Sequence, residues 1–132
     1  MLFLSKSFDS TLAITGLILT AIAVMPQTIR AGRVGDKITF DLSAISPAGL
    51  IGNQQSLRSV SYEFCIPAQT DRVNEVKAID PTVQFSRSRG RIGCQSHQYL
   101  CIGETHQPEW KTVLFKLADL DYVKRIDRFW GE

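Results

Sequence analysis

Hydrophobic and polar residues alternate regularly from residue 59 onward. In the first of these runs every second residue is apolar, which is the period of a strand with one buried face, and Pro67 ends the run. Shorter alternating runs at residues 83–86 and 99–103 predict two further strands. The apolar positions of the three runs are Val60, Tyr62, Phe64 and Ile66, then Val83 and Phe85, then Leu100 and Ile102.

Two segments around these strands have the helical period instead. Thr70 or Asp71 can cap a short helix, which the pair Asp80-Pro81 ends. Pro108 stands where the first turn of a second, more clearly amphipathic helix accepts a proline. The apolar faces consist of Val73, Val76 and Ile79 in the first helix and of Trp110, Val113, Leu114, Leu117 and Leu120 in the second.

A last strand is predicted within residues 122–130, with Val123 and Ile126 as its buried members. The order from residue 59 is then strand, helix, strand, strand, helix, strand. A split βαβ pair of this kind closes into an antiparallel sheet with both helices on one face, because each right-handed crossover returns its helix to the same side. We therefore expect an α+β domain at residues 59–132 with a ferredoxin-like βαββαβ core.

The sheet face without helices is the natural binding surface of such a domain. The strands at Val60 and Leu100 are expected to be central neighbours in this sheet. Because the fold hosts many unrelated activities, its element order alone implies no function. The open face is expected to carry Ser61, Glu63, Cys65, Gln84, Tyr99 and Cys101.

The segment before the predicted domain, residues 26–58, reads as a tether, a short strand and a loop. Apolar residues alternate with polar ones at residues 38–42, which predicts a half-buried strand. Glycines and a proline break the chain between residues 46 and 53, so a loop is expected up to about residue 58. This part of the chain is expected to be an edge strand or a cover over the main domain.

An N-terminal apolar segment precedes the tether, and residues 11–25 carry no charge. The stretch is shorter than the roughly 20 apolar residues that cross a bilayer without strain. Lys6 before it and the small residues Ala21 and Ala23 match a secretory signal peptide that is cleaved after Ala23. We therefore interpret residues 1–25 as a signal peptide or short membrane anchor, and we favour export with cleavage.

The charges that flank this segment leave two alternatives open. Arg30, Arg33 and Lys37 follow the segment, whereas only Lys6 precedes it, and the positive-inside tendency opposes translocation of such a flank. The alternatives are an uncleaved anchor with the domain outside and a cytoplasmic or buried helix. The favoured location is the periplasm, a lumen or the extracellular space, with membrane contact only through the N-terminal segment.

Composition narrows the class of protein further. The 132 residues leave enough chain for one domain with a single core once the leader is removed. Charged residues make up 21% of the chain, as in folded globular proteins. A net charge of +2 is too small to imply a polyanionic partner, and nucleic acid is not expected.

The three cysteines allow at most one internal disulfide in an oxidising compartment. Cys94 and Cys101 flank a polar turn that can bring their Cα atoms to the spacing of a disulfide, so this pair is favoured. Cys65 with Cys101 is the second choice, since both are expected on the open face of adjacent strands. Three reduced thiols that pack as small hydrophobes stay open, as does a thiol-based redox or metal-binding protein that uses all three.

A zinc site is the metal alternative, because Cys94, His97, Cys101 and His106 lie within one short stretch. A strand at residues 99–104 would separate Cys101 from His106 by roughly 16 Å, so the four side chains cannot meet one ion. No metal and no cofactor are therefore expected.

A basic loop is the main candidate for binding. Arg87, Arg89 and Arg91 surround a Gly-x-x-Gly sequence that can present guanidinium groups and backbone N–H groups to an anion. Tyr99 and Glu63 are expected beside this loop on the open face. Export and the shortage of further aromatics argue against a nucleic acid as the ligand. An acidic protein or lipid surface fits better, and a solvated loop is the simplest alternative.

The aromatic C-terminus is expected to pack against residues 38–42, with exposure of Phe129 and Trp130 as the alternative. No hydrolase motif of the Gly-x-Ser-x-Gly or His-Glu-x-x-His type occurs. The sequence therefore predicts a small, non-enzymatic binding or accessory module with a protein partner, such as a subunit of a membrane-associated complex. An anion-binding regulatory domain that acts through the loop at residues 87–91 is an alternative.

Overall fold

The computed structural model describes residues 33–131. The predicted signal peptide or anchor at residues 1–25, its cleavage site and the start of the tether lie outside the described residues. No helix between residues 33 and 131 is long and apolar enough to cross a membrane. The description below concerns this part of the chain alone.

The predicted order of strands and helices from residue 59 is confirmed, and the described residues form an α+β fold with antiparallel sheets. Two further strands of two residues each come before these elements and pair with one another. The elements are β1 (Leu50–Ile51), β2 (Arg58–Ser59), β3 (Ser61–Pro67), α3 (Thr70–Ile79), β4 (Gln84–Ser86), β5 (Gln98–Glu104), α4 (Trp110–Asp119) and β6 (Asp127–Phe129).

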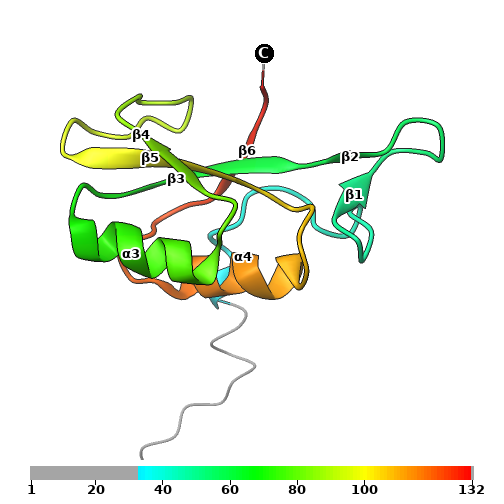
Figure 1. The fold of residues 1–132 in the computed structure, drawn as a ribbon, viewed down its shortest axis with the longest axis horizontal. Coiled ribbons are helices and arrows are strands. Elements are labelled where there is room, and N and C mark those ends of the chain that lie inside the picture. The colour runs from blue at the N-terminus through cyan, green and yellow to red at the C-terminus, as the bar shows by residue number, and fades with distance from the viewer. Residues whose placement is uncertain (1–32, 132) are drawn as a thin grey trace, which may run out of the picture. The chain divides into compact units, whose positions relative to one another are not determined.

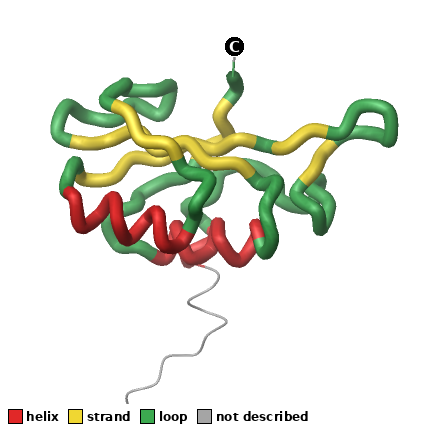
Figure 2. The backbone as a smooth tube through the Cα atoms, viewed as in Figure 1, coloured by secondary structure: helices red, strands yellow, loops and turns green. Residues whose placement is uncertain are grey.

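The main sheet has the strand order β4-β5-β3-β6, and each neighbouring pair is antiparallel. The long strands β3 and β5 are central neighbours, as predicted. Both helices lie on one side of this sheet, while the loop between β4 and β5 lies on the other side (Figures 1 and 2). The short strands β1 and β2 form a separate hairpin beside the sheet (Figure 1).

The helix-covered face holds most of the apolar core. Tyr62, Phe64 and Ile66 of β3 point to this face and are fully buried. They share one core cluster with Leu114 and Leu117 of α4, which are fully buried too. Each such side chain contributes roughly 1.5–3 kcal/mol through its removal from water. The predicted apolar stripes of β3 and α4 are therefore confirmed.

Helix α3 begins and ends close to the predicted residues, but its cap differs from the prediction. Its N-cap residue is Gln69, which makes no side-chain capping hydrogen bond, so the expected caps Thr70 and Asp71 are wrong. Asp80 caps the C-terminus and donates its backbone N–H to the carbonyl of Val76. Neither α3 nor α4 has a side-chain hydrogen bond at its N-cap, so packing on the sheet stabilises the two helices more than capping does.

Strand β5 has the opposite face assignment from the one expected. Cys101 lies opposite Phe64, and Tyr99 lies opposite Ile66, so both side chains are on the helix-covered face. Leu100 and Ile102 take the other face. Both faces of β5 are covered, so apolar residues occur at successive positions and the alternation does not show which face is inside.

Residues 33–58 pack into the core rather than standing apart from it. Ile38 pairs with Ile126 in a single parallel bridge, and the strand expected at residues 38–42 goes no further. Asp41 accepts hydrogen bonds from the backbone N–H and hydroxyl of Ser43 at 2.9 and 2.7 Å, which lowers the pKa of its carboxyl group and turns the chain. The apolar residues of this segment that pack on the core are Val34, Ile38, Phe40, Leu42, Ile45 and Ile51.

Candidate functional site: the strap over the sheet

The loop between β4 and β5, residues 87–97, folds back over the sheet face that carries no helix, and we call it the strap. A disulfide joins Cys94 of the strap to Cys65 of β3, with an S–S distance of 2.05 Å and a Cα–Cα distance of 5.5 Å. The backbone N–H of Ile92 donates to the carboxylate of Glu63 at 3.1 Å. One covalent bond and one partly buried hydrogen bond thus fasten the strap to the central strand.

Gly90 lets the strap approach the sheet closely. Its φ of 65° lies in the left-handed region, which glycine adopts without strain. A Cβ at this position would lie 2.7 Å from Oε1 of Glu63 and 2.8 Å from Cδ1 of Leu100. Glycine is therefore required both by the backbone conformation and by the contact.

Hydrogen bonds within the strap hold its shape. The carbonyl of Arg89 accepts the N–H groups of Gly93 and Cys94 at 3.1 and 2.8 Å. The carbonyl of His97 accepts the N–H of Ala68 at 3.0 Å, which ties the far end of the strap to the end of β3. A loop held in this way loses little conformational freedom on binding.

The observed disulfide shows that both predicted cysteine pairings are wrong. Cys94 pairs with Cys65 and not with Cys101, and Cys101 is a buried free thiol. The error follows from the face assignment of β5, since Cys101 points to the helices and Cys65 to the strap. Burial raises the pKa of the Cys101 thiol to about 12, so it is a poor nucleophile at neutral pH.

The residues predicted for binding fall into three environments. Glu63 is only 1% exposed under the strap, so its carboxylate anchors the loop instead of facing a ligand. Arg87 lies over the ring of Tyr99, 4.8 Å from its centroid, and donates to the carbonyl of Ser96 at 3.0 Å. Arg89 and Arg91 are exposed. The structure therefore brings Arg87 and Tyr99 together. Tyr99 lies on the helix-covered face and not on the open face that was expected for it.

Two further basic residues border the strap, and the sequence analysis did not select them. Arg125 donates to the carbonyl of Ile92 at 3.2 Å and is ion-paired with Asp127 at 3.0 Å. This arginine and Lys124 line a small hollow of about 190 Å³ together with Ile92 and Gly93 of the strap. Their only sequence signal is a pair of adjacent basic residues after the second helix, and pairing across the fold was needed to place them.

A polar cluster on the helix-covered face is the main alternative site. The Tyr62 hydroxyl donates to the fully buried carboxylate of Asp80, which also accepts from the Thr82 hydroxyl at 2.6 Å and from the Gln107 amide at 3.0 Å. Burial and the neighbouring Asp80 carboxylate raise the pKa of Tyr62 above its usual range. Gly103 makes room for the pair, because a Cβ there would lie 2.8 Å from both residues.

The polar groups of this cluster have their hydrogen-bond partners within the protein. No buried side-chain polar atom between residues 33 and 131 lacks a hydrogen-bond partner. A carboxylate whose acceptor positions are filled by protein donors has no free position for a substrate. We therefore assign the cluster a structural role that locks α3 and the segment before α4 to the sheet.

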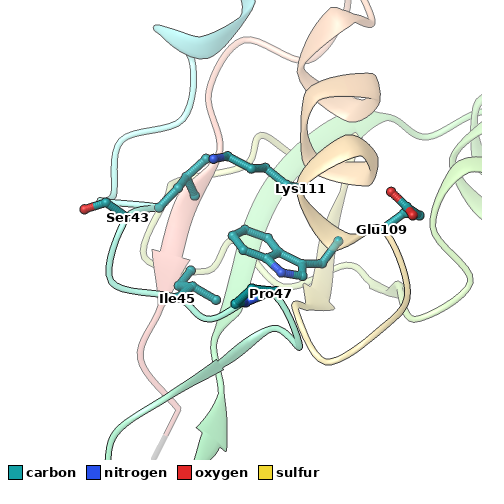
Figure 3. A pocket seen from close by; sticks show the side chains of 7 residues that line it. Ser43, Ile45, Pro47, Glu109 and Lys111 are labelled. Atoms are coloured by element: carbon teal, nitrogen blue, oxygen red, sulfur yellow. The ribbon is translucent and has the colours of Figure 1, made fainter.

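A hollow of about 470 Å³ lies where the loop before β1 meets the start of α4. Figure 3 shows around it Ile45 and Pro47 from that loop, Glu109 at the N-cap of the helix and Lys111 in its first turn. The indole of Trp110, which is 5% exposed, donates to the carbonyl of Ser46 at 3.0 Å and fixes the loop to the helix. The charged side chains around this hollow are exposed. We therefore interpret the hollow as the gap where the loop packs against the helix and not as a ligand site.

The four residues of the zinc alternative do not gather. Cys94 is in the disulfide, and Nδ1 of His106 lies 3.1 Å from the carbonyl of Ala48 beside the β1–β2 hairpin. In the described range, no group of three or more histidine, cysteine, aspartate or glutamate residues is arranged to hold a metal ion.

Comparison with known proteins gives no relative: no protein-family model matches the chain, and no curated protein or solved structure matches it.

Proposed function

We propose that this protein is an exported or membrane-tethered binding module, without enzymatic activity, whose strap docks onto an acidic surface of a protein partner. The observation that carries the proposal is the strap itself. It holds exposed arginines on a loop fixed by a disulfide and by a buried carboxylate.

The charge of the strap supports an anionic partner. Residues 87–97 contain Arg87, Arg89 and Arg91 and no acidic residue. Arg89 and Arg91 are exposed on a loop that is held partly by hydrogen bonds to the Arg89 carbonyl, and their guanidinium forks match the geometry of carboxylates. A preorganised loop makes association with a partner less costly than a mobile one would.

For the domain we propose the ferredoxin-like arrangement. The element order from β3 to β6, the strand order β4-β5-β3-β6 and the antiparallel pairing support it. Two helices on one sheet face leave the other face free, and here the strap occupies that face (Figure 2). The fold thereby presents the strap on the sheet face opposite the helices.

An exported location fits this architecture. The Cys65–Cys94 disulfide is consistent with an oxidising, exported location. A reducing cytosol would leave the strap with only its hydrogen bonds. The N-terminal apolar segment predicted from the sequence supplies the means of export or tethering.

Comparative affinity purification tests this proposal. The tagged full-length chain and its Arg89→Ser/Arg91→Ser variant are crosslinked and purified from native membrane and soluble fractions, and co-purified proteins are quantified by mass spectrometry. We expect at least one acidic partner to be lost with the variant, and to be lost with added salt, since exposed charge pairs are screened.

A matched control separates the strap from net charge. Lys111→Ser/Lys116→Ser removes the same charge from exposed positions of α4, on the helix side of the sheet. Partners that stay bound to this control but not to the strap variant support the proposal. An identical set of partners for wild type and both variants contradicts it.

A further inference from the structure

A second surface, at the β1–β2 hairpin and β6, has exposed apolar side chains. Leu57 is 53% exposed and Trp130 is 54% exposed, and they are the large hydrophobic residues that face solvent between residues 33 and 131. Trp130 borders a hollow of about 300 Å³ together with Ile51, Arg58 and Arg128. Leu57 directly precedes Arg58 in the hairpin but does not line this hollow, so Trp130 is the exposed apolar side chain that the hollow contains. In Figure 1 this hairpin and the strap extend from opposite ends of the sheet.

The exposed indole is held in place by its neighbour. The guanidinium of Arg128 lies 3.9 Å from the centroid of the Trp130 ring. Such stacking fixes an aromatic side chain before binding and keeps its other face free. Tryptophan and arginine are the residue types most enriched among those that dominate binding energies at protein interfaces.

Strand β6 has an edge that can accept another strand. Next to it, the front segment pairs with Ile126 alone: the N–H of Thr39 donates to the Ile126 carbonyl at 3.0 Å, and the N–H of Ile126 donates to the Lys37 carbonyl at 2.8 Å. Beyond Ile126 this pairing stops. Residues 127–129 pair only with β3 within the described part of the chain. Exposed edges of this kind bind extended segments through backbone hydrogen bonds.

The positive charge at this edge favours an acidic segment as the binding partner. Arg58 and Arg128 line the hollow, and no acidic side chain does. The nearest acidic residue of the strand, Asp127, is engaged by Arg125 and by the Thr39 hydroxyl. A segment that docks here gains most if it brings carboxylates to the arginines and an apolar side chain to the indole.

We propose that the outer edge of β6 binds an extended, acidic segment of a partner protein, which places an apolar side chain against Trp130 and carboxylates against Arg58 and Arg128. The site shares no residue with the strap, so it does not depend on the function proposed above. The partner is recognised by backbone pairing and by this pattern of apolar and acidic side chains.

Selection from a random peptide library displayed on phage tests the proposal. The full-length chain is the target, and its Trp130→Ala variant is used for counter-selection. We expect the selected peptides to be rich in aspartate and glutamate around one apolar residue. Synthetic copies should bind Trp130→Ala and Arg128→Glu about tenfold or more weakly than wild type, and should bind Arg89→Ser/Arg91→Ser as tightly as wild type.

Three outcomes would overturn the proposal. The first is a library that yields no peptide after counter-selection, and the second is a set of basic peptides or of peptides that bind Trp130→Ala and wild type equally. The third is a wild-type dimer in sedimentation that Trp130→Ala abolishes, because the surface would then be an interface between two copies. Arg128→Glu keeps the test valid if Trp130→Ala is misfolded by circular dichroism.

Discussion

The two faces of the main sheet are covered by different means. On one face, two helices bury an apolar layer that includes Phe64 and Leu114. On the other face, the strap is fastened through Cys65–Cys94, through Glu63 and through the close approach of Gly90 to Leu100. The helix-covered face depends on burial of apolar area, whereas the strap-covered face depends on one covalent bond and a few local contacts.

Under the function proposed above, this difference separates the part of the molecule that stabilises the fold from the part that binds. Apolar packing between helices and a sheet is insensitive to redox state, whereas we expect the position of the strap to change when the disulfide is reduced. The strap carries the exposed arginines of the proposed site. Under that proposal, the face that contributes less apolar burial presents the binding groups.

The largest effect is expected on the helix-covered face. Phe64→Ala removes a fully buried ring from the core, and we expect a loss of about 3–5 kcal/mol in the free energy of unfolding. Chemical denaturation measures it. Ile102→Ala, at a half-buried position on the strap side, serves as the control and should cost clearly less. Equal losses would contradict the asymmetry between the faces.

Loss of the disulfide should come next. The bond closes a loop with a sequence separation of 29 residues, and its removal by Cys65→Ala/Cys94→Ala should cost about 3 kcal/mol. The strap should also become sensitive to trypsin at Arg89 and Arg91, which mass spectrometry of a timed digest detects. A strap that resists trypsin in this variant would show that the disulfide does not hold it.

Two glycines of the strap offer a matched pair of substitutions. Gly93→Ala strains the backbone alone, because φ is 87° and nothing lies within 4 Å of the new Cβ. Gly90→Ala adds the collision with Glu63 and Leu100 to the same kind of strain. We expect about 1 kcal/mol for Gly93→Ala and about 2 kcal/mol or more for Gly90→Ala. Equal costs would mean that the strap is not pressed onto the sheet.

The buried thiol on the helix-covered face predicts a weakness at high pH. The pKa of Cys101 rises from 9.0 to about 12 on burial, so the unfolded chain loses this proton first. Stability should therefore fall between pH 9 and 12, by up to about 1.4 kcal/mol per pH unit for this group. Cys101→Ala should make the fall shallower in denaturation curves at several pH values. An unchanged slope would mean that the thiol is not buried.

The smallest effect on stability is expected for the arginines of the strap. Arg89 and Arg91 are exposed, so Arg89→Ser/Arg91→Ser should change the free energy of unfolding by less than about 0.5 kcal/mol. Thermal denaturation of the variant checks this. A larger loss would give these side chains a structural role and would weaken their assignment to binding.

Periodicity in the sequence predicts the elements well where apolar residues occupy only one face of an element. The stripe from Trp110 to Leu117 and the alternation from Tyr62 to Ile66 place α4 and β3 correctly, because a single period fits each of them. Strand β5 lacks that clarity. Both of its faces are covered, and its reversed assignment caused the wrong cysteine pairing.

The strap could be located from the sequence, but its position over the sheet could not. Three arginines and two glycines indicate a basic loop between two strands. Its fold back onto β3 depends on contacts between residues far apart in the chain, such as the Ile92 backbone with Glu63. Local patterns contain no information on such pairs, and they favoured packing of the C-terminal aromatics over the exposure that the structure shows for Trp130.

Disulfide mapping tests the central claim most directly. The protein is alkylated without reduction after recovery from an oxidising compartment and is then digested. Trypsin leaves Cys94 and Cys101 on one peptide, residues 92–111, so chymotrypsin is added to cut after Tyr99. The account predicts a cross-linked pair of peptides that joins Cys65 to Cys94, with the alkyl label on Cys101 alone. A link that includes Cys101, or label on all three cysteines, would contradict it.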